Sequence, residues 1–110
     1  MLVKLGVDIS RLKRPMRRAL QPIDNVFIAN TRSEAVLTST YEGTHSPSSL
    51  HYANLACDFR WPKVFYEDHT AHLADRKDGF VKLLRDELGN KFDVVSESSH
   101  IHIEYDPKGV

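Results

Sequence analysis

The sequence predicts an α+β domain with two main helices and a small, mostly antiparallel sheet. Two stretches, residues 11–23 and 67–88, carry their apolar residues on one stripe with charged residues opposite, which is the pattern of an amphipathic helix. Other stretches are short and rich in β-branched and aromatic residues, as strands are. The last two of these, 92–97 and 100–105, are separated by only two serines, and so tight a connection joins antiparallel strands.

The first half of the chain predicts one helix and several short strands. Residues 2–9 alternate weakly between apolar and polar, which indicates a short strand or an ordered arm. Pro15 is tolerated best in the first turn of a helix, so we expect the first helix over about 14–21, with a basic outer face. The remaining strands of this half are expected at 26–29, 35–40 and 55–61.

The second half predicts a long helix followed by a hairpin. The helical pattern of residues 67–88 ends at Gly89, which is well placed as a C-terminal cap. Gly79 lies inside this pattern, where glycine costs about 1 kcal/mol relative to alanine, and it marks a place where the helix could break. Residues 92–97 and 100–105 then form the two strands of the hairpin.

The composition indicates one globular domain over residues 1–110. Hydrophobic residues make up 41% and charged residues 27% of the chain, which is typical of a small folded domain with a single core. The 15 lysines and arginines balance 15 aspartates and glutamates, so the field that would attract a nucleic acid or an anionic membrane is absent. We therefore expect neither as a partner.

The N-terminal region has no apolar stretch of the length that a signal peptide or a membrane span needs. We therefore expect a protein that stays in the cytoplasm until another route releases it. The single cysteine, Cys57, cannot form an internal disulfide and is expected to be a buried, inert thiol. In a strand, its side chain would face away from that of Asp58.

Two stretches concentrate side chains that bind metals or transfer protons. Residues 44–60, THSPSSLHYANLACDFR, and 97–105, ESSHIHIEY, contain the six candidates His45, His51, Asp58, Glu97, His100 and His102. Side chains alternate along a strand, so His100 and His102 share one face, which Glu104 continues. These groups suit one zinc ion and its catalytic helpers.

The spacing of His51 and Asp58 fits a metal site. Seven positions let the chain leave the site after the histidine and return at the aspartate on the next strand, and their nitrogen and oxygen atoms suit zinc. Three protein ligands with an open fourth position are the mark of a catalytic rather than a structural zinc. The alternative is a surface histidine in a serine-rich loop and an aspartate that pairs with Arg60 or caps a turn.

The stretch EGTHSPSSLHYANLACD resembles the SxHxxGxAxD signature of the LAS metallopeptidases, which include D-Ala-D-Ala carboxypeptidases, phage endopeptidases and the amino-terminal domain of Hedgehog. The wording is most similar to Hedgehog, and KFDVVSESSHIHIEY resembles the last Hedgehog motif with one residue fewer before HxH. The resemblance covers roughly residues 36–105 and implies a Hedgehog/D-Ala-D-Ala peptidase-like fold. Four residues fall on the signature, with Asn54 in the place of its glycine: Ser49, His51, Ala56 and Asp58.

The resemblance also implies roles for the candidate residues. The zinc ligands would be His51, Asp58 and His102, and Glu97 would be the general base. His100 and His45 would flank the bound water and the developing oxyanion. The shortening before HxH leaves a second interpretation, in which His100 is the third ligand.

These observations predict a zinc-dependent peptidase that hydrolyses an amide bond in the peptide of bacterial peptidoglycan, as a phage or bacterial product. Many LAS peptidases carry an arginine shortly before the first motif, and STYE places Glu42 there, which argues against assuming a D-Ala-D-Ala substrate. The alternative is a Hedgehog-like zinc-binding module with little hydrolytic activity. A metal-free domain with incidental histidines is the third interpretation.

Overall fold

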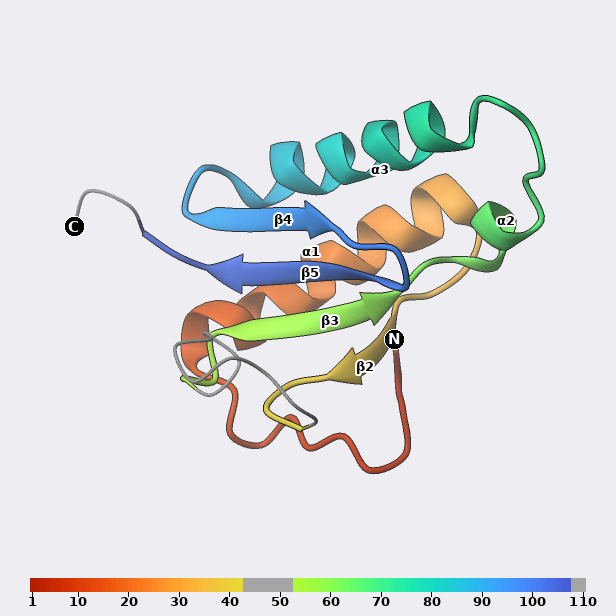
Figure 1. The fold of residues 1–110 in the computed structure, drawn as a ribbon. Helices are drawn as coiled ribbons and strands as arrows, with labels where there is room; N and C mark the ends of the chain where they lie inside the picture. Colours follow the sequence, from red (N-terminus) through yellow and green to blue (C-terminus); the bar gives the residue numbers. More distant parts are fainter. Residues whose placement is uncertain (43–52, 108–110) are drawn as a thin grey trace.

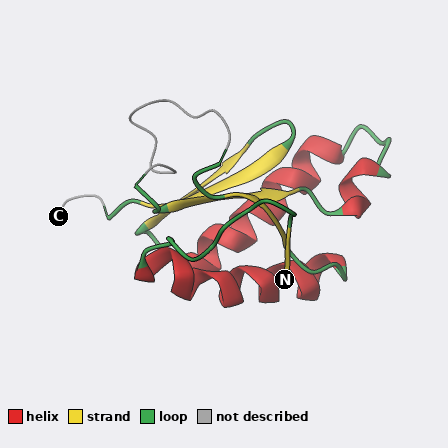
Figure 2. Cartoon of the chain, turned by 90° about the horizontal axis from the view of Figure 1, so that it is seen from below, coloured by secondary structure: helices red, strands yellow, loops and turns green. Residues whose placement is uncertain are grey.

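The computed structural model describes residues 1–42 and 53–107. Within them, one mixed sheet is covered on one face by two long helices, and no helix covers the other face (Figures 1 and 2). The helices are α1 (Arg14–Thr31), the short α2 (Lys63–Tyr66) and α3 (Leu73–Leu88), and the strands are β1 (Leu2–Val3), β2 (Val36–Ser39), β3 (Ala56–Arg60), β4 (Phe92–Ser96) and β5 (His100–Tyr105).

The strand order is β1-β2-β3-β5-β4, and every pairing is antiparallel except that of β1 with β2. The predicted α+β architecture, with two main helices and a mostly antiparallel sheet, is therefore confirmed. The strands predicted at 35–40, 55–61, 92–97 and 100–105 are all present to within one or two residues at each end. Among the described residues, no helix is long and apolar enough to cross a membrane.

The first helix is much longer than the sequence predicted. It was expected over about 14–21 with a strand at 26–29, but α1 continues to Thr31, so that strand is wrong. Pro22 lies inside the helix, although it has no N–H to donate to the carbonyl of Arg18. The helix ends at Arg32, which has a left-handed backbone (φ 59°) and donates its N–H to the carbonyl of Ile28.

Burial explains why the chain stays helical beyond Pro22. The buried side chains of α1 keep the three- and four-residue spacing of one helical face, and they pack into the common core: Met16, Ala19, Ile23, Val26 and Phe27. A four-residue apolar run does not distinguish a helix from a strand by its own pattern. Tertiary packing of this face therefore decides the conformation of residues 26–29.

The second long helix begins later than its sequence pattern suggested. Residues 67–72 precede it, and α3 starts at Leu73. It runs through Gly79 without a break and ends as predicted at Gly89, which has φ 85° and donates its N–H to the carbonyl of Arg85. A positive φ is easily adopted by glycine, so Gly89 stops the helix and turns the chain into β4.

The aromatic core lies between the sheet and the helices. The ring of Phe27 lies 5.0 Å from that of Phe80 and 5.9 Å from that of Phe59, measured between centroids. Trp61 and Phe65 extend the cluster, with ring centroids 5.2 Å apart. Residues of the sheet and of both long helices therefore share one core.

Alternation along β3 and β5 separates the core from the opposite face of the sheet. Cys57 and Phe59 of β3 join the core, as do Ile101 and Ile103 of β5. Cys57 is fully buried, and this burial raises the pKa of its thiol far above the ordinary value. Asp58 therefore points to the other face, as predicted.

The helical conformation of residues 26–29 predicts which substitutions destabilise the protein. Phe27 is 1% exposed and Ile28 is 49% exposed. We expect Phe27→Ala to lower the free energy of unfolding by about 3–5 kcal/mol, because it removes a ring from the aromatic core. Chemical denaturation measures this change.

Two variants on either side of Phe27 provide the comparison. Val26→Ala should also destabilise, whereas the matched control Ile28→Ala should change the free energy of unfolding by only about 0.5 kcal/mol. A strand would place residues 26 and 28 on the same face. Equal effects of Val26→Ala and Ile28→Ala would therefore contradict the helix.

Candidate metal and catalytic site

The candidate site lies on the face of the sheet that the helices do not cover. Asp58 on β3 is directly opposite His102 on β5, and Arg60 is opposite His100. Opposed residues of antiparallel strands project from the same face. The Oδ1 atom of Asp58 lies 3.0 Å from Nδ1 of His102 and 3.7 Å from Nε2 of His100. The structure therefore brings three predicted site residues around one carboxylate oxygen.

His102 lies between two carboxylates. Its Nδ1 atom contacts Asp58, and its Nε2 atom lies 2.8 Å from Oε1 of Glu104, two residues along β5. Asp58 is only 7% exposed, so this pair is shielded from water. Burial lowers the pKa of His102, but the hydrogen bonds to Asp58 and Glu104 outweigh it and raise the pKa above its ordinary value. Without a metal, these contacts therefore stabilise the protonated ring relative to an imidazole in water.

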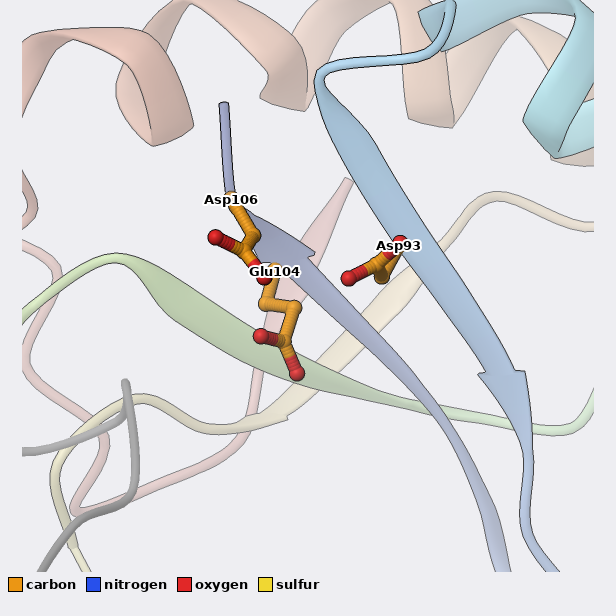
Figure 3. A group of neighbouring side chains, drawn as sticks. All are labelled: Asp93, Glu104 and Asp106. Atoms are coloured by element: carbon orange, nitrogen blue, oxygen red, sulfur yellow. The ribbon is translucent and has the colours of Figure 1, made fainter. Parts of the chain in front are cut away.

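Glu104 also belongs to a cluster of three carboxylates. Atoms of Asp93, Glu104 and Asp106 lie within 4.8 Å of one another, so this group could hold a metal ion. Figure 3 shows Asp93 on β4 facing Glu104 on β5, with Asp106 just beyond the end of β5. A set made only of carboxylates suits harder cations than zinc. Asp93 and Asp106 were not among the residues predicted from the sequence, although the predicted hairpin pairs Asp93 with Glu104.

Glu97, the predicted general base, lies in the turn between β4 and β5. Its N–H donates to the carbonyl of His100 at 3.0 Å, and its own carbonyl accepts a hydrogen bond from Nε1 of Trp61 at 2.8 Å. These bonds hold the backbone, while the side chain is exposed. Val95 is opposite His102, so strand alternation continued by two residues places Glu97 on the same face as the two histidines.

The two candidates for the third zinc ligand, His102 and His100, lie at different distances from Asp58. His102 is closer to Asp58 than His100 is, by 3.0 Å against 3.7 Å. Nδ1 of His100 lies 2.9 Å from the hydroxyl of Ser99, which orients the ring from the turn. His45 and His51, the predicted helper and ligand from the first motif, lie outside the described residues, as does Ser49.

Glu42, which stands where many LAS peptidases have an arginine, is half-buried and held by two backbone N–H groups. Its Oε2 atom accepts the N–H of Asp8 at 2.7 Å, and its Oε1 atom accepts the N–H of Thr40 at 2.9 Å. Burial raises the pKa of Glu42, but the N–H groups of Thr40 and Asp8 outweigh it, and the net pKa is lowered. Glu42 therefore fastens the N-terminal arm to the end of β2.

No protein-family model matches the chain, and neither a curated protein nor a solved structure matches it. Its own geometry defines the candidate site as a buried aspartate on β3 with two histidines and a glutamate on the adjacent strand β5. This combination places metal ligands next to groups that accept or donate protons.

The two carboxylate contacts predict the titration of His102. In metal-free protein, an NMR titration should give His102 a pKa above 6.5, and Glu104→Gln should lower that pKa because it removes one of the two charges. A raised pKa in the folded state stabilises the fold below pH 6.5, and this stabilisation is lost as pH rises through the folded-state pKa.

Glu87 on α3 provides a matched control, since it is exposed and lies on the other side of the sheet. Glu87→Gln should leave the pKa of His102 unchanged. A His102 pKa at or below 6.5 in the unsubstituted, metal-free protein would contradict the observed arrangement of the two carboxylates.

Proposed function

We propose that this protein is a zinc-dependent peptidase that hydrolyses an amide bond in the peptide of bacterial peptidoglycan. The observation that carries the proposal is the meeting of Asp58, His100 and His102 around one carboxylate oxygen. These residues come from the two stretches that resemble the LAS metallopeptidase motifs. The resemblance is also the reason to propose a Hedgehog/D-Ala-D-Ala peptidase-like arrangement within the observed α+β fold, and a phage or bacterial origin.

The spacing of Asp58 and His102 is compatible with a shared zinc ion. Ligand atoms at about 2.1 Å from a tetrahedral zinc lie about 3.4 Å from each other. The observed 3.0 Å between Oδ1 of Asp58 and Nδ1 of His102 needs only a small adjustment. His51 would be the third ligand by resemblance, and Glu104 would hold the other ring nitrogen of His102, as carboxylates do for zinc-bound histidines.

Side chains of this protein would transfer the protons and stabilise the developing charge. A bound zinc supplies Lewis acidity, which makes a water molecule easier to deprotonate at neutral pH. Glu97 would take the proton of the attacking water and pass it to the departing amine. His100, with His45 by resemblance, would donate hydrogen bonds to the oxyanion that develops on the scissile carbonyl.

The alternative is a zinc-binding module with little hydrolytic activity, and the role of Glu42 favours it. The place of the arginine that grips a substrate carboxylate in many LAS peptidases is taken by a residue whose carboxylate is bound to Asp8 and Thr40. Zinc binding does not require hydrolysis, because it depends on Asp58 and His102, whereas the zinc-dependent hydrolysis also depends on Glu97.

The proposed base can be tested with one conservative substitution. Purified peptidoglycan is incubated with zinc-loaded wild type and with Glu97→Gln, and released termini are identified by mass spectrometry. We expect wild type to release new amine and carboxylate termini, and Glu97→Gln to be slower by roughly 100-fold to 10,000-fold, because the glutamine cannot accept the proton. A chelator should abolish the release, and added zinc should restore it.

Glu87→Gln serves as the charge-matched control and should keep wild-type activity, since Glu87 lies on α3 across the sheet from the site. Zinc content is measured for all three proteins. Activity that persists in Glu97→Gln or in chelator would overturn the proposed mechanism. Zinc bound with no released termini would instead identify the binding module.

A further inference from the structure

A second candidate site lies at the end of the molecule where α1 begins, α3 ends and β4 begins (Figure 1). We call it the basic groove, a cavity of about 420 Å³. Its main lining residues are Arg14, Arg18, Leu88, Lys91, Phe92 and Tyr105. Phe92 and Tyr105 pack against the core beneath the helices, so the groove is on the opposite side of the sheet from Asp58 and His102.

Three cations meet at the groove without a partner among the described residues. Arg14 and Arg18 are one turn apart on α1, and Lys91 approaches from the connection between α3 and β4. Within residues 1–42 and 53–107, none of these side chains has a hydrogen bond or an ion pair. One acid, Glu87, also lines the groove, so three positive charges and one negative charge give a net charge of +2.

Two other basic residues near the start of α1, Arg11 and Arg17, make contacts within the protein, whereas Lys13 lies just before the helix and does not line the groove. The guanidinium of Arg17 donates to the carbonyls of Ser10 and Leu12, and that of Arg11 lies 4.9 Å from the ring centroid of Tyr41. Arg14 and Arg18, by contrast, make no such contacts with the described residues, and both line the groove. A helix start with no side-chain cap and no acidic residue in its first turn adds to the positive potential there.

The floor of the groove is apolar. The rings of Phe92 and Tyr105 meet edge to face, with centroids 5.3 Å apart and planes at 67°. Leu88 and Pro22 continue this surface, and all four side chains are half-buried. A ligand that complements the groove therefore carries negative charge at its rim and an apolar group toward its floor.

We propose that the basic groove binds a short acidic peptide segment that carries one aromatic or aliphatic side chain between its carboxylates. Guanidinium groups bind carboxylates in a bidentate manner, and the aromatic pair accepts the apolar side chain. A nucleic acid is disfavoured because Glu87 lies in the groove and the chain as a whole has no net charge. The proposal is independent of the proposed hydrolysis, because the two sites share no residue.

The test uses the full chain and the acetylated, amidated peptide Glu-Glu-Phe-Glu-Glu as the probe. A second peptide, with glutamine in place of each glutamate, lacks the charge but keeps the phenylalanine. A third peptide, with glycine in place of phenylalanine, keeps the charge but lacks the apolar group. Binding is measured by calorimetry in the presence of a chelator, and the site is mapped by NMR. We expect the probe to bind, both altered peptides to bind at least roughly tenfold more weakly, and amide shifts to centre on Arg18, Leu88 and Phe92.

A pair of double variants distinguishes binding in the basic groove from an effect of the protein's total charge. Arg18→Gln with Lys91→Gln should weaken probe binding by roughly tenfold or more, whereas Arg32→Gln with Lys82→Gln, which removes two charges elsewhere, should change it less than about twofold. Circular dichroism checks that both variants are folded. Equal weakening in both double variants, binding of the glutamine peptide as tight as the probe, or no probe binding at millimolar concentration would overturn the proposal.

Two further ligands test which chemical class of ligand the basic groove prefers. The same peptide with phosphoserine in place of glutamate, and a short DNA duplex, are titrated under the same conditions. The acidic-peptide proposal expects neither to bind more tightly than the probe. Tighter binding of either one in the groove would replace it with a phosphate-binding site.

Discussion

The strict alternation of side chains along β3 and β5 is the constraint on which both the fold and the candidate site depend. Phe59 and Ile101 are paired in register and lie fully buried under the helices, so the intervening positions must face the other way. A slip of one residue would move Asp58 into the apolar core and Cys57 to the outer face. The packing that stabilises the domain therefore also fixes the meeting of Asp58 with His102.

The same constraint gives the site its electrostatic character. Asp58 is almost fully buried, and a buried carboxylate is costly unless it is paired. His102 pairs with Asp58 at 3.0 Å through one ring nitrogen and contacts Glu104 through the other. Glu104 in turn lies beside the carboxylates of Asp93 and Asp106. In one state of these residues, a protonated His102 lies between the carboxylates of Asp58 and Glu104. Replacing the proton by a metal ion would keep a positive charge in nearly the same place.

Much of the fold could be predicted from local sequence signals. The alternation in HIHIEY predicted that the two histidines share one face of a strand, and Gly89 predicted the end of the long helix. Where the prediction of α1 failed, the local pattern was ambiguous: Val26 and Phe27 suit a strand as well as a helix, and only their burial against α3 and the sheet decides. Local patterns carry no information about such packing.

The site was predictable to a smaller degree, because its parts come from distant positions. The sequence indicated Asp58, His100 and His102, which the structure brings together, whereas the ligand role of His51 and the helper role of His45 remain predictions. Glu42 was expected to bear on substrate choice, but its hydrogen bonds to Asp8 and Thr40 depend on the path of the N-terminal arm, which no local pattern reveals.

The position of a bound zinc ion would show whether Asp58 and His102 together form the metal site. Crystals grown with one equivalent of zinc are measured at wavelengths on both sides of the zinc absorption edge, and the anomalous difference map locates the ion. We expect one peak at about 2.0–2.2 Å from both Oδ1 of Asp58 and Nδ1 of His102. A peak confined to the carboxylates of Asp93, Glu104 and Asp106, or no peak at all, would contradict it.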